Sequence, residues 1–275
     1  MKLSVSNIAW PSEQRGAAYD LLRDHGVSGL EFAPGLLFPG HDAPLGATAQ
    51  DCNEVIAELS AYGLRPSSMQ SLLFGVPDAH LFGPPKAQQT LQDTMQAAIG
   101  LAARLNCRNL VFGSPANRLI PDEMSPIQAQ TIWHDSFQRL GDMAASREVV
   151  VALETNPVQY GTNFMTTIAE TLAVVRAVDH PAVQMNLDLG AAILTGEIET
   201  VDDWLAPALD ASHHVHLSAP DLAPLSTQAA MVRRICAALD AAGWNGWVSV
   251  EMRGGLEALS ESLTACFGPQ SERAE

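Results

Sequence analysis

Apolar residues along the chain fall into two alternating kinds of segment, short continuous runs and longer stretches with helical spacing. The plainest short run is Val149-Val150-Val151-Ala152-Leu153, which leads directly into Glu154. It shows no alternation of polar and apolar positions and is rich in β-branched residues, as is typical of a parallel strand covered on both faces. Asn156-Pro157 then prevents its continuation. We therefore predict a buried strand with a carboxylate at its exit.

The same alternation continues through the whole chain and predicts eight strand–helix units. The predicted strands are residues 2–9, 29–32, 64–70, 109–112, 149–154, 183–188, 213–217 and 247–251. The predicted helices are residues 13–25, 48–62, 86–105, 126–146, 163–178, 200–209, 227–242 and 256–267. Eight such units indicate an α/β fold, a (β/α)₈ TIM barrel that forms a single domain over residues 1–275. An open doubly wound sheet is the alternative, but it usually has fewer strands and a glycine-rich first turn.

Composition and charge narrow the class of protein. The chain has 275 residues, of which 47% are hydrophobic, and its formal net charge of −16 disfavours nucleic acid or anionic membranes as partners. No apolar run is long enough to span a membrane, and the N-terminal residues lack a signal-peptide pattern. The four cysteines are scattered without a CxxC motif, which suggests reduced thiols. We expect a soluble cytoplasmic protein.

Four consecutive predicted strands carry an ionisable side chain at or near their exits. These residues are Glu154, Asp188, His216 and Glu251. In a barrel the four strands are neighbours, and their carboxyl ends lie on the face where such folds build their sites. Three carboxylates in one place repel each other unless a cation lies between them. We therefore predict one divalent metal ion, and the ligand types suit Mn²⁺, Mg²⁺, Co²⁺ or Zn²⁺.

The order and spacing of these four residues resemble the xylose isomerase-like barrel superfamily, specifically its sugar phosphate isomerase/epimerase branch, which includes the ketose 3-epimerases. The resemblance covers essentially the whole chain. Its other segments are residues 6–10, 30–34, 70–75, 111–118 and 250–253. It implies that the four residues bind one divalent metal and that Glu154 and Glu251 also transfer the proton. The implied reaction is isomerisation or epimerisation of a sugar or sugar phosphate through an enediolate.

The chain departs from the ketose 3-epimerases around the metal residues. Those enzymes carry a His three residues after the metal-binding Asp, where this chain has Ala191. They carry a Glu six residues after the first metal Glu, where this chain has Tyr160. They also carry an Arg soon after the metal His, and residues 217–222 contain none. The residues that would bind the sugar therefore differ from those of the ketose 3-epimerases, and the resemblance does not predict the substrate.

Six residues are candidates for substrate binding: Gln70, Asn156, Arg253, Arg118, Trp10 and Tyr160. Gln70 and Asn156 are neutral hydrogen-bonding groups at strand exits, suited to hydroxyl groups or to support of the metal ligands. Arg253 and Arg118 are each able to bind a phosphate or carboxylate, or to pair with one of the surplus acids. Trp10, together with Phe74, is a candidate apolar wall.

Three further polar residues lie on the predicted strands. His214 shares the inward face of His216 by strand alternation but lies one layer deeper, so we expect it to pack in the core or support a ligand. His213 should then face the helices. Glu31, at the end of the second strand, is interpreted as a polar contact or an ion-pair partner.

Other functions remain open on this pattern. A polyol or inosose dehydratase on the same fold shares the deprotonation step but expels a hydroxyl group. A barrel that binds a sugar without turnover is also compatible with the altered residues. An AP endonuclease-like phosphodiesterase needs more His and Asp ligands and a DNA-binding face, which the negative charge disfavours. We expect a small-molecule sugar or sugar phosphate as partner, with a homo-oligomer left open.

Overall fold

The computed structural model describes residues 1–268, and its eight strands close into one parallel barrel in which every strand pairs with its neighbours in chain order. The strands are β1 Lys2–Ser6, β2 Gly29–Phe32, β3 Arg65–Met69, β4 Asn109–Phe112, β5 Val150–Glu154, β6 Val183–Asp188, β7 Ser212–Ser218 and β8 Trp247–Glu251. Pairing of β1 with β8 completes the closure. The predicted TIM barrel is confirmed.

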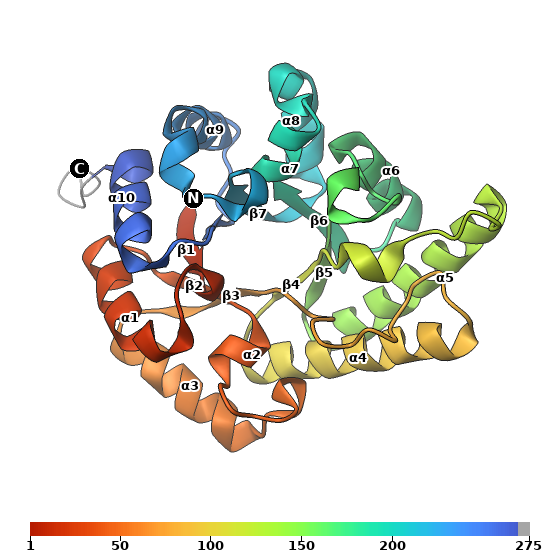
Figure 1. Cartoon of the computed structure of the whole chain (residues 1–275), viewed down its shortest axis with the longest axis horizontal. Helices are drawn as coiled ribbons and strands as arrows, with labels where there is room; N and C mark the ends of the chain where they lie inside the picture. The colour runs from red at the N-terminus through yellow and green to blue at the C-terminus, as the bar shows by residue number, and fades with distance from the viewer. Residues whose placement is uncertain (269–275) are drawn as a thin grey trace.

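Helices surround the barrel as an outer ring, as Figure 1 shows. They are α1 Arg15–Asp24, α2 Pro34–Leu37, α3 Ala49–Ala61, α4 Pro85–Arg104, α5 Pro126–Ala145, α6 Ile168–Val178, α7 Leu189–Leu194, α8 Val201–Asp210, α9 Ala229–Ala241 and α10 Gly255–Phe267. Each long helix packs an apolar stripe onto the strands, as where Phe137 of α5 meets Phe112 of β4 edge-on at 5.6 Å between ring centroids. Because the helices cover the outer face of every strand, runs such as Val150–Glu154 carry no polar alternation.

The predicted strands and long helices all occur, with small shifts at their ends. The short helices α2 and α7 were not predicted, because each is only about one turn long and has no room for apolar periodicity. No helix within residues 1–268 is long and apolar enough to cross a membrane. All four cysteines are buried and free.

One orientation predicted on β7 is wrong. The register between β6 and β7 shifts between Met185 and Asn186, which leaves His213 without a partner in the ladder. Such a bulge turns the chain, so His213 points into the bottom of the barrel and its Nδ1 lies 2.8 Å from Oδ1 of Asn109. His213 therefore does not face the helices. His214, as predicted, shares the inward face with His216.

The barrel interior carries layers of hydrogen-bonded polar side chains. The Oγ atoms of Ser4 and Ser67 lie 2.6 Å apart near the amino-terminal ends of the strands. The side-chain nitrogen of Asn109, at the start of β4, donates to Ser68. His214 Nε2 lies 2.8 Å from Oγ of Ser249. Buried polar groups are tolerated where they are paired, so these bonds support a polar centre at the carboxyl ends of the strands.

Candidate metal centre

Two carboxylates from different strands approach the same nitrogen of one imidazole. Nδ1 of His216 on β7 lies 3.0 Å from Oε1 of Glu154 on β5 and 3.2 Å from Oε2 of Glu251 on β8. All three residues are buried, and their possible ligand atoms lie within 4.8 Å of one another. Three of the four strand ends that the sequence predicted to converge therefore do so.

The donor set fits a divalent cation. Although both carboxylates lie at ion-pair distance from Nδ1 of His216, neither is aligned for a hydrogen bond, so this buried nitrogen has no hydrogen-bond partner within residues 1–268. The possible ligand atoms of Glu154, His216 and Glu251 lie close together without hydrogen bonds between them, as the ligands of one metal ion do. An imidazole nitrogen and carboxylate oxygens are also the ligand types used for Zn²⁺ and Mn²⁺.

The other imidazole nitrogen is held by a third carboxylate. Nε2 of His216 lies 2.8 Å from Oε2 of Glu31, at the end of β2 on the far side of the barrel. The amide of Gln70 donates to Oε1 of Glu31 at 3.0 Å, and to Oγ of Ser6 at 2.7 Å. If Nε2 donates its proton to Glu31, the lone pair of Nδ1 points at Glu154 and Glu251. Glu31 thus sets which nitrogen is free to bind a metal.

Electrostatics reinforce the pair of Glu31 and His216. Burial by itself raises the pKa of the Glu31 carboxyl, but His216 and His214 outweigh burial and hold it well below its usual range. Burial likewise lowers the pKa of His216, while Glu31 and Glu251 outweigh it and raise the pKa well above the usual range. These carboxylates favour the protonated form of His216, and a metal ion bound at Nδ1 would take the place of that proton.

Asp188 borders this group at the end of β6 but lies outside the set whose ligand atoms are within 4.8 Å of one another. Its Oδ1 accepts hydrogen bonds from the backbone N–H of Gly190, at 2.9 Å, and from the hydroxyl group of Ser218. Burial and the nearby charges of Glu154 and Glu251 raise the pKa of Asp188 to about 7. Asp188 thus shares the electrostatic environment of the other carboxylates and also caps α7.

Neighbouring side chains fix the Glu154 carboxylate. Asn186 donates to Oε1 at 2.7 Å, and Asn156 donates to Oε2 at 3.2 Å. Gly113, just after β4, leaves the space that Oε2 occupies, since a Cβ atom there would lie 2.5 Å from it. The sequence did not indicate Gly113 or Asn186, because Gly113 has no side chain and Asn186 lies within β6 rather than at its exit.

Arg118 lies beneath the site rather than in an open cavity. Its side chain is fully buried, and Nη1 donates to the backbone oxygen of Glu154 at 2.8 Å. Its Nε and Nη2 have no hydrogen-bond partner in the part of the chain that the structure describes. Burial lowers the pKa of Arg118 to about 9, and the negative charge of Glu154 works against that shift. The guanidinium is therefore placed to hold the end of β5 in position.

Three of the other predicted residues line two cavities on the same face of the barrel, and Asn156 and Tyr160 line neither of them. Gln70 lines a cavity of ≈260 Å³ together with Glu154, His216 and Glu251. Trp10 and Arg253 line a larger one of ≈1180 Å³. Asn156 contacts Glu154, as described above. The hydroxyl group of Tyr160 accepts a 3.4 Å hydrogen bond from the backbone N–H of Asp221, and burial raises its pKa.

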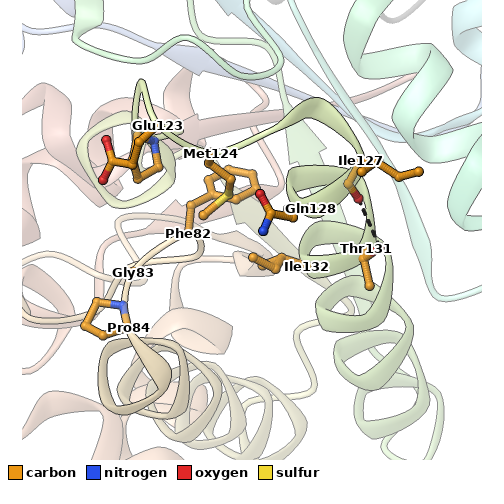
Figure 2. Close-up of a pocket in the computed structure, with 10 residues that line it drawn as sticks. Phe82, Gly83, Pro84, Glu123, Met124, Ile127, Gln128, Thr131 and Ile132 are labelled. Carbon is orange, nitrogen blue, oxygen red and sulfur yellow. Dashed lines mark hydrogen bonds between the residues drawn. The ribbon is translucent and has the colours of Figure 1, made fainter.

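A separate cavity lies between the start of α5 and the segment that precedes α4. It has a volume of ≈640 Å³, and Figure 2 shows Met124, Gln128 and Ile132 beside Phe82 in it. Among the described residues that form its wall, Glu123 alone is ionisable. These wall residues include no cluster of acids, bases or possible metal ligands, whereas the cavity over His216 does.

Comparison with known proteins agrees with the fold. Residues 19–266 match the protein family described as xylose isomerase-like TIM barrel. Among curated protein sequences none matches the chain.

Several solved structures have the same architecture. The 3-keto-D-glucoside 4-epimerase from E. coli has a TM-score of 0.75 at 19% identity, covering 96% of this chain and 98% of its own. The D-psicose 3-epimerase of Clostridium cellulolyticum H10, solved with D-tagatose, has a TM-score of 0.69 at 17% identity, with 100% and 93% covered. An AP endonuclease, family 2, from Brucella melitensis has a TM-score of 0.68 at 20% identity, with 97% and 98% covered. At these identities the likeness concerns the fold.

Proposed function

This chain belongs to the xylose isomerase-like TIM barrel family, and we propose that it is a metal-dependent isomerase or epimerase that moves a proton next to the carbonyl group of a sugar or sugar phosphate. One observation carries the proposal. Glu154 and Glu251, on different strands, both approach Nδ1 of His216 in a cavity that opens at the carboxyl ends of the strands. Two carboxylates placed around one position are what removal and return of a proton require.

The metal would be held by Glu154, Glu251 and His216, with Asp188 as the fourth ligand. A divalent ion in this place supplies the positive charge that stabilises an enediolate formed next to a carbonyl group. Glu31 keeps the His216 ring in the orientation that presents Nδ1. Gln70 reaches both Glu31 and the cavity, so it links the support of the metal site to the substrate.

The protons would be moved by Glu154 and Glu251 themselves. A substrate carbon between the two carboxylates loses its proton to one of them and receives a proton from the other on the opposite face, which inverts the carbon. Return to the neighbouring carbon on the same face gives aldose–ketose isomerisation instead. Asn186 and Asn156 hold the Glu154 carboxylate in a single orientation during this transfer.

The proposed substrate class is supported by the structural neighbours. Two of the three proteins compared above are described as acting on a 3-keto-D-glucoside and on D-psicose, and the second was solved with D-tagatose. Each of these sugars has a carbonyl group beside a hydroxyl-bearing carbon, which is the group that this chemistry needs.

Isotope exchange tests the proposal. Protein purified without chelator should contain about one divalent ion per chain, and a keto sugar incubated with it in heavy water should gain deuterium at the carbon next to the carbonyl group. The variants E154Q and E251Q should each slow exchange about 10²- to 10⁴-fold, because a carboxamide accepts no proton. Protein that refuses added Mn²⁺, or a panel of keto sugars and their phosphates without exchange, would contradict the proposal.

A further inference from the structure

A large apolar cavity adjoins the cavity over His216 at the carboxyl ends of the strands. Its volume is ≈1180 Å³, and its walls come from the loops that follow β1, β2, β3 and β8 and from helix α4. Ile8, Trp10, Pro34, Leu36, Leu72 and Phe74 are among its apolar wall residues. The proposed chemistry at Glu154 and Glu251 uses none of this space.

The two cavities share a wall. Ser71 and Phe74 line both of them, so a molecule seated over His216 would extend past these residues into the larger space. The cavity over His216 alone holds ≈260 Å³, which is below the roughly 300–1000 Å³ of most small-molecule sites. The metal centre therefore has room for one small polar group, and the rest of a larger ligand would lie in the apolar cavity.

The charges of the large cavity lie at its edge. Its ionisable residues are His41, Asp42, Asp93 and Arg253, and all four are exposed. Trp10, in contrast, is buried and packs against Tyr19, with its ring fixed at 89° to that of Tyr19. The inner wall thus presents apolar and aromatic surface to the interior of the cavity, where a hydroxyl-rich sugar would gain few hydrogen bonds.

Phe74 is the second feature that points to an apolar ligand. Its side chain is 90% exposed although it lines both cavities. It lies in a short turn between Ser71 and Gly75, which have φ angles of 56° and 79°. A serine in the left-handed region costs conformational energy, so the turn is held in a form that displays the ring. A ligand in the shared space would cover this exposed apolar surface.

We propose that the substrate is a glycoside, with its sugar ring over His216 and an apolar aglycone in the large cavity. This deepens the proposed function and rests on it. An aglycone on the anomeric oxygen keeps the sugar ring closed, so the carbonyl group next to the exchanged proton must lie on a ring carbon. The substrate class is then a glycoside that carries a ketone on its ring, beside a hydroxyl-bearing carbon.

Calorimetry on the full-length, Mn²⁺-loaded protein tests the proposal with two matched probes. They are the 3-keto derivatives of phenyl β-D-glucoside and methyl β-D-glucoside, which differ only in the aglycone. Burial of the phenyl group should make the phenyl probe bind about tenfold tighter than the methyl probe. Equal affinities would overturn the proposal.

Two variants locate any preference. Gly35 lies in α2 on the wall of the cavity, and a Cβ atom added there would meet no described atom within 4 Å apart from its chain neighbours and the backbone of α2, so G35F adds a ring at this wall without a clash at Cβ. G35F and F74A should both reduce the preference for the phenyl probe towards unity. The control I127A removes an apolar side chain, 73% exposed, from the separate cavity in Figure 2, and should leave the preference unchanged. A preference that G35F and F74A leave intact would place the aglycone elsewhere and overturn the proposal.

Failure of this inference is distinguishable from failure of the proposed function. Deuterium uptake by the methyl probe reports proton transfer and does not depend on the large cavity. Uptake without a preference for the phenyl probe refutes the aglycone site and leaves the proposed function standing. Binding of the phenyl probe without uptake of deuterium from either probe or from any keto sugar refutes the proposed function.

Discussion

At the scale of single residues, the imidazole of His216 joins the carboxylates of the site. One nitrogen faces Glu154 and Glu251, and the other faces Glu31. An imidazole bound in this way has only one lone pair to offer, and its direction is set by the strands rather than by loops. The geometry of the site is therefore as rigid as the barrel itself.

Gly113 controls the position of one of these carboxylates. We predict that G113A moves the Glu154 carboxylate, because a methyl group would lie 2.5 Å from its Oε2. The affinity for Mn²⁺ should fall about 10- to 100-fold. The thermal midpoint should change little, because the end of a flexible side chain can move aside. Titration calorimetry gives the affinity. The control is G35A, where the added methyl group meets no described atom within 4 Å, and equal affinities for the two variants would contradict the prediction.

Glu31 should act on the metal through His216. In E31Q the buried carboxylate that orients the ring is lost while its shape is kept, so the affinity for Mn²⁺ should fall about 10- to 100-fold. The comparison is E251Q, which removes a proposed ligand and should lower the affinity further. Calorimetry on both variants at one pH makes the measurement. If E31Q binds as tightly as the native protein, Glu31 has only a structural role.

The sequence predicted that Glu154, Asp188, His216 and Glu251 converge because their four strands are consecutive, and the structure brings possible ligand atoms of Glu154, His216 and Glu251 within 4.8 Å of one another. It predicted Glu31 as a polar contact or an ion-pair partner, which the ion pairs with His214 and His216 confirm, but it did not identify these partners, because β2 lies across the barrel from β7. Nor did it predict that Arg118 is fully buried beneath β5. Both facts depend on distances across the closed barrel, which a pattern along the chain does not contain.

At the scale of elements, the loops after β2 and β3 carry the features that distinguish this barrel. α3 follows the first of them and begins at a capping box, in which the side chain of Thr48 accepts from Asp51 N at 3.2 Å and Asp51 accepts from Thr48 N at 2.7 Å. Such a start ends the loop at a defined residue. The wall that this loop contributes to the large cavity is thereby anchored at one end.

Removing the cap should loosen this helix. T48A should lower the free energy of unfolding by about 1 kcal/mol, because the N–H of Asp51 loses its acceptor. Denaturant unfolding measures the change. T131A in α5 is the control: its hydroxyl group bonds to the backbone oxygen of Ile127 within the helix, so its loss should change stability by less than about 0.5 kcal/mol. Equal losses in the two variants would show that the cap contributes nothing.

Strands and long helices were predictable because each is long enough to show its own period of apolar positions. The bulge in β7 was not, because one residue added to a strand leaves no trace in such a pattern. It turned His213 from the expected helix-facing side to the barrel interior. The short helices α2 and α7 were not predicted for a related reason, because four and six residues are too few to show a helical period of apolar positions.

At the scale of the whole molecule, the stability of the fold depends on pH where the unfolded chain binds a proton that the folded chain does not. The many carboxylates of the chain give it a net charge of −16, but most of them are exposed, whereas His213 is half-buried at the bottom of the barrel. Burial lowers the pKa of His213 from 6.5 to about 4, helped by His214 and Arg108. The folded protein therefore resists a proton that the unfolded chain accepts.

Stability should consequently fall as the pH decreases from about 6.5 towards about 4. In this window the unfolded chain binds more protons at this position than the folded chain. Protonation of His213 therefore lowers the free energy of unfolding as the pH falls through the window, by ~3 kcal/mol at most, and has no effect above it. Urea unfolding between pH 4 and 7 measures the slope. H213Q should flatten the slope, while H134Q, which replaces an exposed histidine, should not. Parallel slopes for native protein and H213Q would refute this assignment.

The bond between Glu31 and His216 also joins an early part of the chain to a late one. Its partners are 185 positions apart in the chain, so the link forms only after most of the polypeptide has assembled around it. A nascent chain that has produced β5 to β8 without docking β2 holds all four proposed ligands but lacks the carboxylate that aims the ring. Tight metal binding would then require that the barrel has closed. An incompletely folded chain would bind an ion only weakly.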